Sequence, residues 1–459
     1  GSTTIAMHLV SLLSGRIVAS AGAPNPQIRF GEDVMSRVSY VMMNPDGQGA
    51  MTAAVHQAVN DLIGKVCAEG GVDRKDIFDS VFVCNPIMHH LFLGIDPTEL
   101  GQAPFALAVS GAVQGWAHDI GIDINRGARF YLLPCIAGHV GADAAGATLS
   151  EGPYRQDKMM LLVDVGTNAE IVLGNKSHVV AASSPTGPAF EGAEISSGQR
   201  AAPGAIERVR IDPLTYEPKY RVIGVDKWSD EEGFEEAAKA TGVTGICGSA
   251  IIEVVAEMYL SGLISEDGVI DGALSASTPR IFQNGRTFSY LLRDGQPRIT
   301  VTQNDIRAIQ LAKAALYAGT KLLMEKQGIE QVDTIRFAGA FGSFIDPKYA
   351  MVLGLIPDCD LAEVKAVGNA SGTGALMALL NRDHRREIED EVSKIEKIET
   401  ALEPDFQRLF INAMALPNKV DAFPKLSEQV KLPPRKLDEA GADGDGGPRR
   451  RGREGRRRG

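Results

Sequence analysis

Residues 159–173 read MMLLVDVGTNAEIVL. The apolar run from Met159 to Val165 is typical of a strand that is buried on both faces. The Gly-Thr-Asn triplet that follows predicts a tight turn, and Glu170 to Leu173 predict the returning strand of a hairpin. Glycine at such a turn lets the backbone approach a phosphate group, and nearby hydroxyl and N–H groups can bind the phosphate oxygens. Asp164, two residues before the glycine, is a hard oxygen ligand of the kind that a hydrated Mg²⁺ ion prefers.

A second segment of this kind opens the chain. Gly1-Ser2-Thr3-Thr4 runs into an apolar strand candidate, as Gly166-Thr167-Asn168 does later. We interpret each as the tip of a hairpin. Two phosphate clamps that face one cleft require two related domains, so the pair is a stronger indication of a phosphate site than either turn alone.

Two further glycine-rich turns complete the pattern. Residues 335–342 (IRFAGAFG) predict a strand that runs into a helix, and backbone at such a turn can lie flat against an adenine or a ribose. Residues 368–375 (GNASGTGA) predict a helix start with free N–H donors. Glycine is common at strand–helix turns of α/β proteins, so each turn alone is equally consistent with a structural role. Their joint order favours an ATP site.

The composition excludes several classes of protein. Hydrophobic residues make up 44% of the 459 residues and charged residues 23%, as in an ordinary globular protein. No apolar stretch is long enough to predict a membrane helix. The net charge is −11, although residues 441–459 are rich in arginine, so the body is more acidic still. We therefore expect binding to neither nucleic acid nor membrane.

The cysteines indicate reduced thiols. The chain has five of them, and no two are spaced as Cys-x-x-Cys. This pattern is typical of a cytoplasmic protein and offers no local zinc or iron–sulfur signature.

In their order along the chain, the four elements resemble those of the superfamily of acetate and sugar kinases, heat-shock chaperones and actin. This resemblance implies an α/β fold of two ribonuclease-H-like (actin-like ATPase) domains with a nucleotide cleft between them. It also implies that the two hairpin turns are phosphate motifs and that residues 335–342 are the adenosine motif. Ala340 departs from the pattern, since the superfamily usually has a second glycine there.

Longer strings resemble one family within this group, the reductive activators of corrinoid-dependent methyltransferases. They are MHHLFLG (88–94), GPAFEG (187–192), RAAPGAI (200–206), GICGS (245–249), and Asp305-Ile306 with QLAKA (310–314). The resemblance extends from residue 1 to about residue 425. It implies ATP-dependent reduction of a corrinoid protein from Co(II) to Co(I), with ATP and Mg²⁺ bound by this chain.

The resemblance also implies partners and a further domain. The expected partners are a corrinoid protein or a corrinoid-dependent methyltransferase and a ferredoxin-type electron donor, with a homodimer as one option for assembly. Family members carry an iron–sulfur domain, often a [2Fe–2S] ferredoxin, ahead of the ATPase. We therefore expect this chain to be N-terminally incomplete, to lack the first strand of its first domain, and to bind no cluster itself.

The expected domain boundaries follow from the resemblance and from composition. Residues 1–155 are the first actin-like domain, which is the middle domain of the activator family. Residues 156–425 are the second actin-like domain, and residues 426–459, rich in proline, glycine and charge, are a disordered tail.

The site residues are predicted from the same motifs. The predicted catalytic residues are Asp164, Glu170 and Glu191, and Asp164 is also the predicted metal ligand. The predicted nucleotide-binding residues are Gly1, Ser2, Thr3, Thr4, Gly166, Thr167, Asn168, Gly339, Ala340, Phe341, Gly342 and Gly372.

Other residues allow a functional and a structural interpretation. Arg200 could contact phosphate or be an ordinary exposed arginine, and Cys247, at a helix start, could be reactive or simply buried. His89 and His90 lie in an apolar run, which favours packed histidines over ligands. Arg449 to Arg458 could contact nucleic acid or a membrane surface, but the interleaved acids favour a solubilising tail.

Two other functions remain open from the residues alone. One is a small-molecule kinase of the same superfamily, and the other is a chaperone-like, ATP-dependent binding module. The loop at 183–205 favours the corrinoid activator, because its strings resemble that family.

Overall fold

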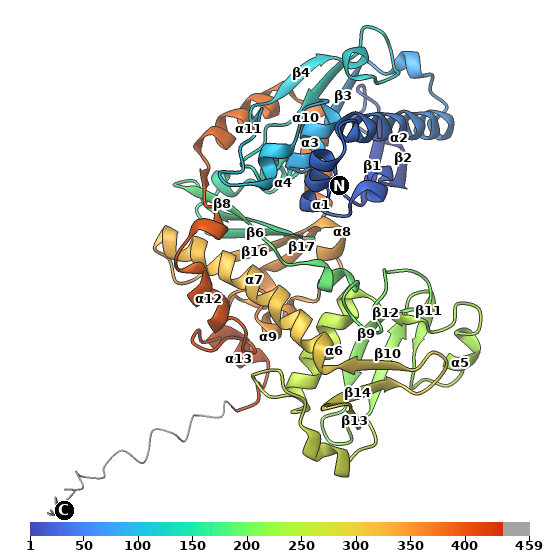
Figure 1. The fold of residues 1–459 in the computed structure, drawn as a ribbon, viewed down its shortest axis with the longest axis vertical. Coiled ribbons are helices and arrows are strands. Elements are labelled where there is room, and N and C mark those ends of the chain that lie inside the picture. The colour runs from blue at the N-terminus through green and yellow to red at the C-terminus, as the bar shows by residue number, and fades with distance from the viewer. Residues whose placement is uncertain (167, 435–459) are drawn as a thin grey trace, which may run out of the picture.

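The computed structural model describes residues 1–166 and 168–434. The chain forms two lobes that are stacked along its long axis, with the N-terminus on the side of the first lobe that faces the second (Figure 1). The expected mixed α/β architecture is confirmed. None of the helices in the described part of the chain combines the length and apolarity that crossing a bilayer requires.

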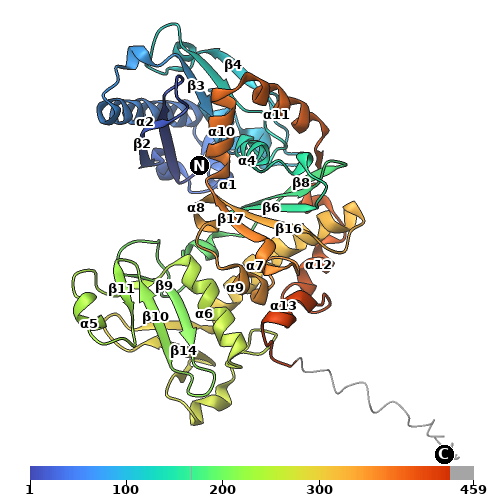
Figure 2. The same ribbon diagram turned by 180° about the vertical axis from the view of Figure 1, so that it is seen from behind.

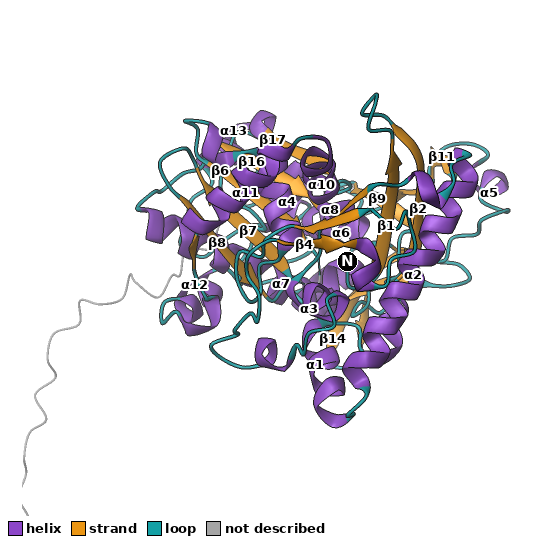
Figure 3. Ribbon diagram, turned by 90° about the horizontal axis from the view of Figure 1, so that it is seen from above, coloured by secondary structure: helices purple, strands orange, loops and turns teal. Residues whose placement is uncertain are grey.

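The first lobe contains two separate groups of strands. An antiparallel hairpin, β1 (Thr4–Val10) and β2 (Ile17–Pro24), is distinct from a three-stranded sheet of order β3-β5-β4. The sheet strands are β3 (Asp79–Phe82), β4 (Val113–Trp116) and β5 (Arg129–Leu132). The helices of this lobe are α1 (Val34–Met43), α2 (Gly47–Gly70), α3 (Pro86–Phe92) and α4 (Ala142–Glu151). The long helix α2 lies alongside the hairpin (Figure 3).

A six-stranded sheet of order β17-β16-β6-β7-β8-β18 forms the centre of the second lobe. The predicted hairpin is its core: β6 (Met160–Val165) pairs antiparallel with β7 (Ala169–Gly174), and β7 with β8 (Val179–Ser184). The other strands, parallel to their neighbours, are β16 (Thr334–Ala338), β17 (Val364–Gly368) and β18 (Glu396–Lys397). The side chains of β6 are buried except for that of Asp164, which is partly exposed. This single polar position therefore marks the end of the strand that faces the candidate site.

Two small sheets, antiparallel except for the parallel pair β9 and β12, extend the second lobe away from the first (Figure 1). Their strands are β9 (Ala205–Ile211), β10 (Pro218–Val222), β11 (Val225–Trp228), β12 (Gly245–Ile246), β13 (Ile281–Asn284), β14 (Thr287–Arg293) and β15 (Ile299–Thr302). The helices of this lobe are α5 (Phe234–Ala237), α6 (Gly248–Leu260), α7 (Gln303–Gln327), α8 (Gly339–Gly342), α9 (Pro347–Leu353), α12 (Phe406–Asn412) and α13 (Pro424–Gln429).

Two helices from the predicted second domain pack on the first lobe instead. These are α10 (Ala370–Leu380) and α11 (Arg382–Lys394), which lie beside α4 on the first lobe (Figure 2). Arg385 of α11 forms an ion pair with Asp79 of β3 at 2.7 Å, and its guanidinium lies over the ring of Tyr131. The predicted second domain, residues 156–425, thus contributes two helices that cover part of the first lobe. The close packing of α10 on α4 joins them to it.

The contact between α4 and α10 is made by glycine backbones. A Cβ at Gly374 would overlap the carbonyl oxygen of Gly146, and a Cβ at Gly146 would lie 2.8 Å from the Ser371 oxygen. Gly374 of the 368–375 segment thus has a packing role, since only a residue without a side chain lets the two helix backbones approach so closely.

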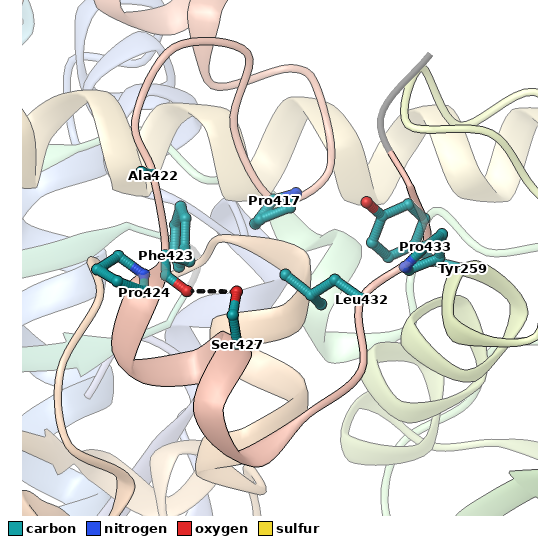
Figure 4. A pocket seen from close by; sticks show the side chains of 8 residues that line it. All are labelled: Tyr259, Pro417, Ala422, Phe423, Pro424, Ser427, Leu432 and Pro433. Carbon is teal, nitrogen blue, oxygen red and sulfur yellow. Dashed lines mark hydrogen bonds between the residues drawn. The ribbon is translucent and has the colours of Figure 1, made fainter. Parts of the chain in front are cut away.

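One predicted boundary in the C-terminal region was wrong. Beyond the end of α11 at Lys394 the chain stays packed on the second lobe, since Ile398 is buried and its N–H donates to Ala181 of β8. The expected tail from residue 426 begins too early, because Leu426 is fully buried and its N–H donates to Asp358 at 3.0 Å. Figure 4 shows Leu432 lying between Ser427 and Tyr259. Arg449 to Arg458 lie outside the described residues.

We predict that Gly374→Ala lowers the melting temperature, because its Cβ has no room against the Gly146 backbone. The expected cost is about 1–3 kcal/mol in the free energy of unfolding. Gly49→Ala in α2 is the matched control, since nothing lies within 4 Å of a Cβ built there. It should be neutral or stabilising by up to ~1 kcal/mol. Thermal unfolding followed by circular dichroism measures both, and equal melting temperatures for the two variants would contradict the packing argument.

Candidate nucleotide site

A pair of carboxylates forms the centre of the candidate site. Asp164 of β6 and Glu170 of β7 are direct cross-strand partners, so both side chains lie on one face of the sheet. Like charges placed opposite each other are destabilising unless a proton or a cation compensates them. The pair therefore has the chemistry of a site for a hydrated divalent cation.

A third carboxylate, Asp143, lies in the first turn of α4 and acts on the same pair. Burial raises the pKa of Asp164 to about 7, and the negative charge of Asp143 adds to this effect. Burial also raises the pKa of Glu170 well above its usual value, again helped by Asp143 and Asp164. Burial likewise raises the pKa of Asp143. Three carboxyl groups from both lobes therefore share one electrostatic environment.

Sequence reasoning missed Asp143. An acidic residue in the first turn of a helix is ordinarily explained by the helix dipole, so nothing local distinguishes it. Its position depends on the packing of α10 on α4, where the Ser371 hydroxyl donates to the Asp143 carbonyl at 2.8 Å.

Gly339 brings the third motif against the carboxylates. It has φ +85°, which favours glycine, and a Cβ there would overlap Oδ1 of Asp164. The turn at the start of α8 therefore lies directly beside the predicted metal ligand. Gly342 is also closely packed, since its Cβ would lie 3.3 Å from Phe337, and Ala340 belongs to α8 as well.

The N-terminal turn lies near the same carboxylates. Asp143 and Asp164 both interact electrostatically with the backbone nitrogen of Gly1. The structure thus brings the two predicted phosphate turns into one region. Gly1 to Thr3 lead into β1 at the end opposite the β1–β2 turn, and the interpretation of Gly1–Thr4 as a hairpin tip stays a prediction.

The second phosphate turn is only partly described. Gly166 donates its N–H to the Asn168 carbonyl at 3.0 Å, and its own carbonyl accepts from the Thr186 hydroxyl at 2.9 Å. Thr167 lies outside the described residues. The roles of Gly166, Thr167 and Asn168 in nucleotide binding stay predictions.

The loop after β8 contacts the adenosine-type turn. Phe190 is fully buried, and its ring is stacked on that of Phe341 in α8 with centroids 6.2 Å apart. A Cβ at Gly248 would lie 2.6 Å from the Phe341 ring, so the start of α6 closes over the pair. A shift of α8 would therefore move Phe341 against Phe190 and so displace this loop.

A second contact fixes the far end of the same loop. The Ser196 hydroxyl and N–H both donate to Asp305 at the start of α7, at 2.6 and 2.8 Å. Asp305 also accepts from the Thr302 N–H as part of a capping box, so one carboxylate joins the loop to the helix start.

A cavity of about 280 Å³ lies between this loop and the first lobe. The first lobe contributes Thr3, Glu32 and Asp33, and the loop contributes Glu191 and Arg200 among others. The structure thus places the predicted residues Thr3 and Glu191 on opposite sides of one space. Arg200 is exposed.

Gly372 has a different local role from the one expected. Its N–H donates to the Asn369 side chain, which caps α10, so it is not a free donor. Its nucleotide contact stays a prediction. Within the part of the chain that the structure describes, no three His, Cys, Asp or Glu side chains converge closely enough to ligate a metal directly. The carboxylates suit an ion held through water, as expected for Mg²⁺.

His89, His90 and Cys247 are buried in the core, as their apolar surroundings indicate. His90 bonds to the Pro86 carbonyl and accepts from the Ala108 N–H. Burial lowers the pKa of His89 to about 4, so its ring is neutral at physiological pH.

Two family models together match almost all of the described chain. The RACo middle region matches residues 1–156, and the C-terminal domain of RACo, the ASKHA domain, matches residues 158–427. The chain belongs to the RACo family. The resemblance inferred from the short sequence strings is therefore confirmed.

Individual relatives of the RACo family extend this finding. The chain is 34% identical over 424 residues to the corrinoid activation enzyme RamQ of Eubacterium limosum, covering 90% of this chain and 68% of RamQ. It is 24% identical over 401 residues to a Methanosarcina barkeri reductase of a methylated-amine-specific Co(II) corrinoid protein, covering 83% of this chain and 68% of the relative.

A solved structure agrees with these relatives. The reductive activator for a corrinoid, iron–sulfur protein superposes with a TM-score of 0.77 and 34% identity, covering 91% of this chain. The alignment covers 65% of that activator, so this chain spans about two thirds of the length of the proteins that it matches.

The carboxylate site predicts an unusual dependence of stability on pH. Because the pKa of Asp164 is about 7 in the folded chain and ordinarily 3.8, the folded state binds its proton more tightly than the unfolded state. Wild-type stability should therefore fall as the pH rises from about 4 to about 7. Asp164→Asn removes this loss, so its melting temperature should exceed that of the wild type by a few degrees at pH 8 and match it near pH 4.

The measurement is thermal unfolding of both proteins across this pH range. Asp46→Asn, at an exposed aspartate whose side chain makes no capping bond, is the control and should follow the wild type at every pH. A melting difference for Asp164→Asn that is independent of pH would contradict the assignment.

Proposed function

We propose that this chain binds Mg²⁺-ATP between its lobes and uses it to drive the reduction of a corrinoid protein from Co(II) to Co(I). The chain is the ATPase component, and a ferredoxin-type donor supplies the electron. The named activities of the relatives, a corrinoid activation enzyme and a Co(II) corrinoid protein reductase, support this reading over a small-molecule kinase or a chaperone-like module.

The observation that carries the proposal is the cross-strand pair Asp164 and Glu170, with Asp164 against Gly339 and Asp143 acting on both carboxyl groups. The residues present fit Mg²⁺-ATP, because the paired carboxyl groups need a compensating cation and the absence of a side chain at Gly339 lets the adenosine-type turn lie directly against Asp164. Bound Mg²⁺ would supply positive charge to the phosphates. Asp164 is proposed to orient the hydrated ion, and Glu170 and Glu191 are proposed to orient the attacking water.

The nucleotide must also change what the partner meets. A ligand shifts an equilibrium only by its differential affinity for the two states. The loop from Gly187 to Arg200 meets this requirement, since Phe190 contacts the adenosine-type turn while Glu191 and Arg200 line the cavity between the lobes. We therefore propose that the conformation of this loop depends on the bound nucleotide and that the corrinoid protein binds the loop.

Energy scales show why such coupling is needed. For a one-electron step, about 30 mV corresponds to roughly 0.7 kcal/mol. Electron transfer to Co(II) from a donor whose potential is too high is unfavourable. This cost must be offset by forming a complex in which the corrinoid is easier to reduce. Tighter partner binding in the ATP state implies, by reciprocity, tighter ATP binding with the partner present.

The direct test mixes the chain with a Co(II) corrinoid protein and a low-potential chemical reductant, with and without Mg²⁺-ATP. We expect ATP to increase the yield of Co(I), measured by its absorption spectrum, and Asp164→Ala to abolish both this increase and ATP hydrolysis. The Asp46→Asn variant is the control. Unchanged hydrolysis in Asp164→Ala would reject the metal assignment. Absence of any ATP effect, together with phosphorylation of acetate or a sugar, would establish the kinase alternative.

A second prediction tests the loop contact. Phe190→Leu removes the ring stacked on Phe341 but keeps an apolar side chain, so ATP should still bind. The increase in ATP affinity caused by the Co(II) corrinoid protein, expected at about 5–150-fold in the wild type, should fall toward one. Phe406→Leu is the control, because the Phe406 ring lies tilted against that of Phe410 in α12, outside the candidate site. Nucleotide titrations with and without the corrinoid protein measure the effect, and an undiminished increase in Phe190→Leu would contradict the role of the stack.

A further inference from the structure

Arg37 in α1 is a buried cation that the nucleotide motifs do not include. Its side chain is among the largest that are fully enclosed in the protein, with 0% of its surface exposed. Its contacts are with neutral acceptors: the Gly31 carbonyl at 2.9 Å, the Gln27 side-chain oxygen at 3.2 Å, the Met88 sulfur at 3.0 Å and the Ser2 carbonyl. Burial of such a charge without a paired anion is costly.

The charge is retained despite this cost. Burial lowers the pKa of Arg37 to about 10, so the guanidinium is still protonated at neutral pH. The charge of Asp33 offsets part of the lowering, but the Asp33 carboxylate accepts the Ser36 N–H as the cap of α1. An expensive positive charge next to the N-terminal turn therefore needs an explanation beyond packing.

The contacts of the turn indicate what this charge does. Three successive carbonyl oxygens accept bonds from the interior of the first lobe: Gly1 from the Asn25 side chain, Ser2 from Arg37, and Thr3 from the Asn25 N–H. In a trans peptide the C=O and the following N–H point in opposite directions. The Thr3 N–H, which shares its peptide with the Ser2 carbonyl, is thus directed away from Arg37, and Thr3 lines the cavity between the lobes.

We propose that Arg37 is the positioning residue of the first phosphate-binding turn, and that it favours a polyphosphate ligand. It holds the Ser2 carbonyl so that the N–H groups of the turn are available to phosphate oxygens. Its buried charge also stabilises a polyanion beside the turn, an effect that grows with the number of phosphates. This inference rests on the proposed function, since it concerns the same nucleotide.

The test compares the binding of ATP, ADP and AMP, each with Mg²⁺, by isothermal titration calorimetry. Arg37→Gln removes the charge and most of the fork of donors. A bond to a charged group contributes about 1.5–3 kcal/mol, so we expect ATP affinity to fall by about 10–150-fold and AMP affinity to fall much less. Arg37→Lys keeps the charge but cannot hold the Ser2 and Gly31 carbonyls together, so its ATP affinity should lie between those of wild type and Arg37→Gln.

The matched control is Arg29→Gln in the same lobe, because Arg29 is exposed and lies over the Phe30 ring. Its nucleotide affinities should equal those of the wild type. Thermal unfolding establishes that each variant is folded, and Arg37→Lys provides the test if Arg37→Gln does not fold. A purely structural Arg37 would weaken all three nucleotides equally or none of them, and either result overturns the inference. Failure of the wild type to bind ATP would instead reject the proposed function.

Discussion

The contact between α4 and α10 is the constraint on which the candidate site depends. Gly146 and Gly374 let the two helix backbones meet without side chains between them. The same contact holds α4 so that Asp143, in its first turn, lies near the carboxylates of the second lobe. Helix packing and site chemistry are therefore not independent here, because a change in the helix separation also changes the distance between like charges.

The site combines features that oppose stability. Asp164 and Glu170 face each other across a strand pair, and Arg37 is enclosed without an anionic partner. Each arrangement is unfavourable in the absence of a ligand and becomes favourable with a ligand of opposite charge nearby. A cation would compensate the Asp164–Glu170 pair, and a polyphosphate would compensate Arg37. A single metal–nucleotide ligand therefore accounts for both arrangements.

The local pattern of the sequence predicted much of the second lobe. The β6–β7 hairpin and β16 were expected almost at their observed bounds, because apolar runs and glycine turns act over a few residues. The two small sheets were not anticipated, nor was the strand β18. Those features depend on pairing between distant segments, such as that of β18 with β8.

By itself, the sequence determined the α/β class, the family and the turns at Gly166 and Gly339, since these follow from contiguous residues. Only the tertiary structure decided that Asp143 joins the carboxylates, that α10 and α11 pack on the first lobe, and that Arg37 holds the N-terminal turn. The physical reason is that the burial of a side chain and the compensation of its charge depend on its three-dimensional surroundings, here called its neighbourhood. Residues far apart in the chain form that neighbourhood, and no short window of sequence contains it.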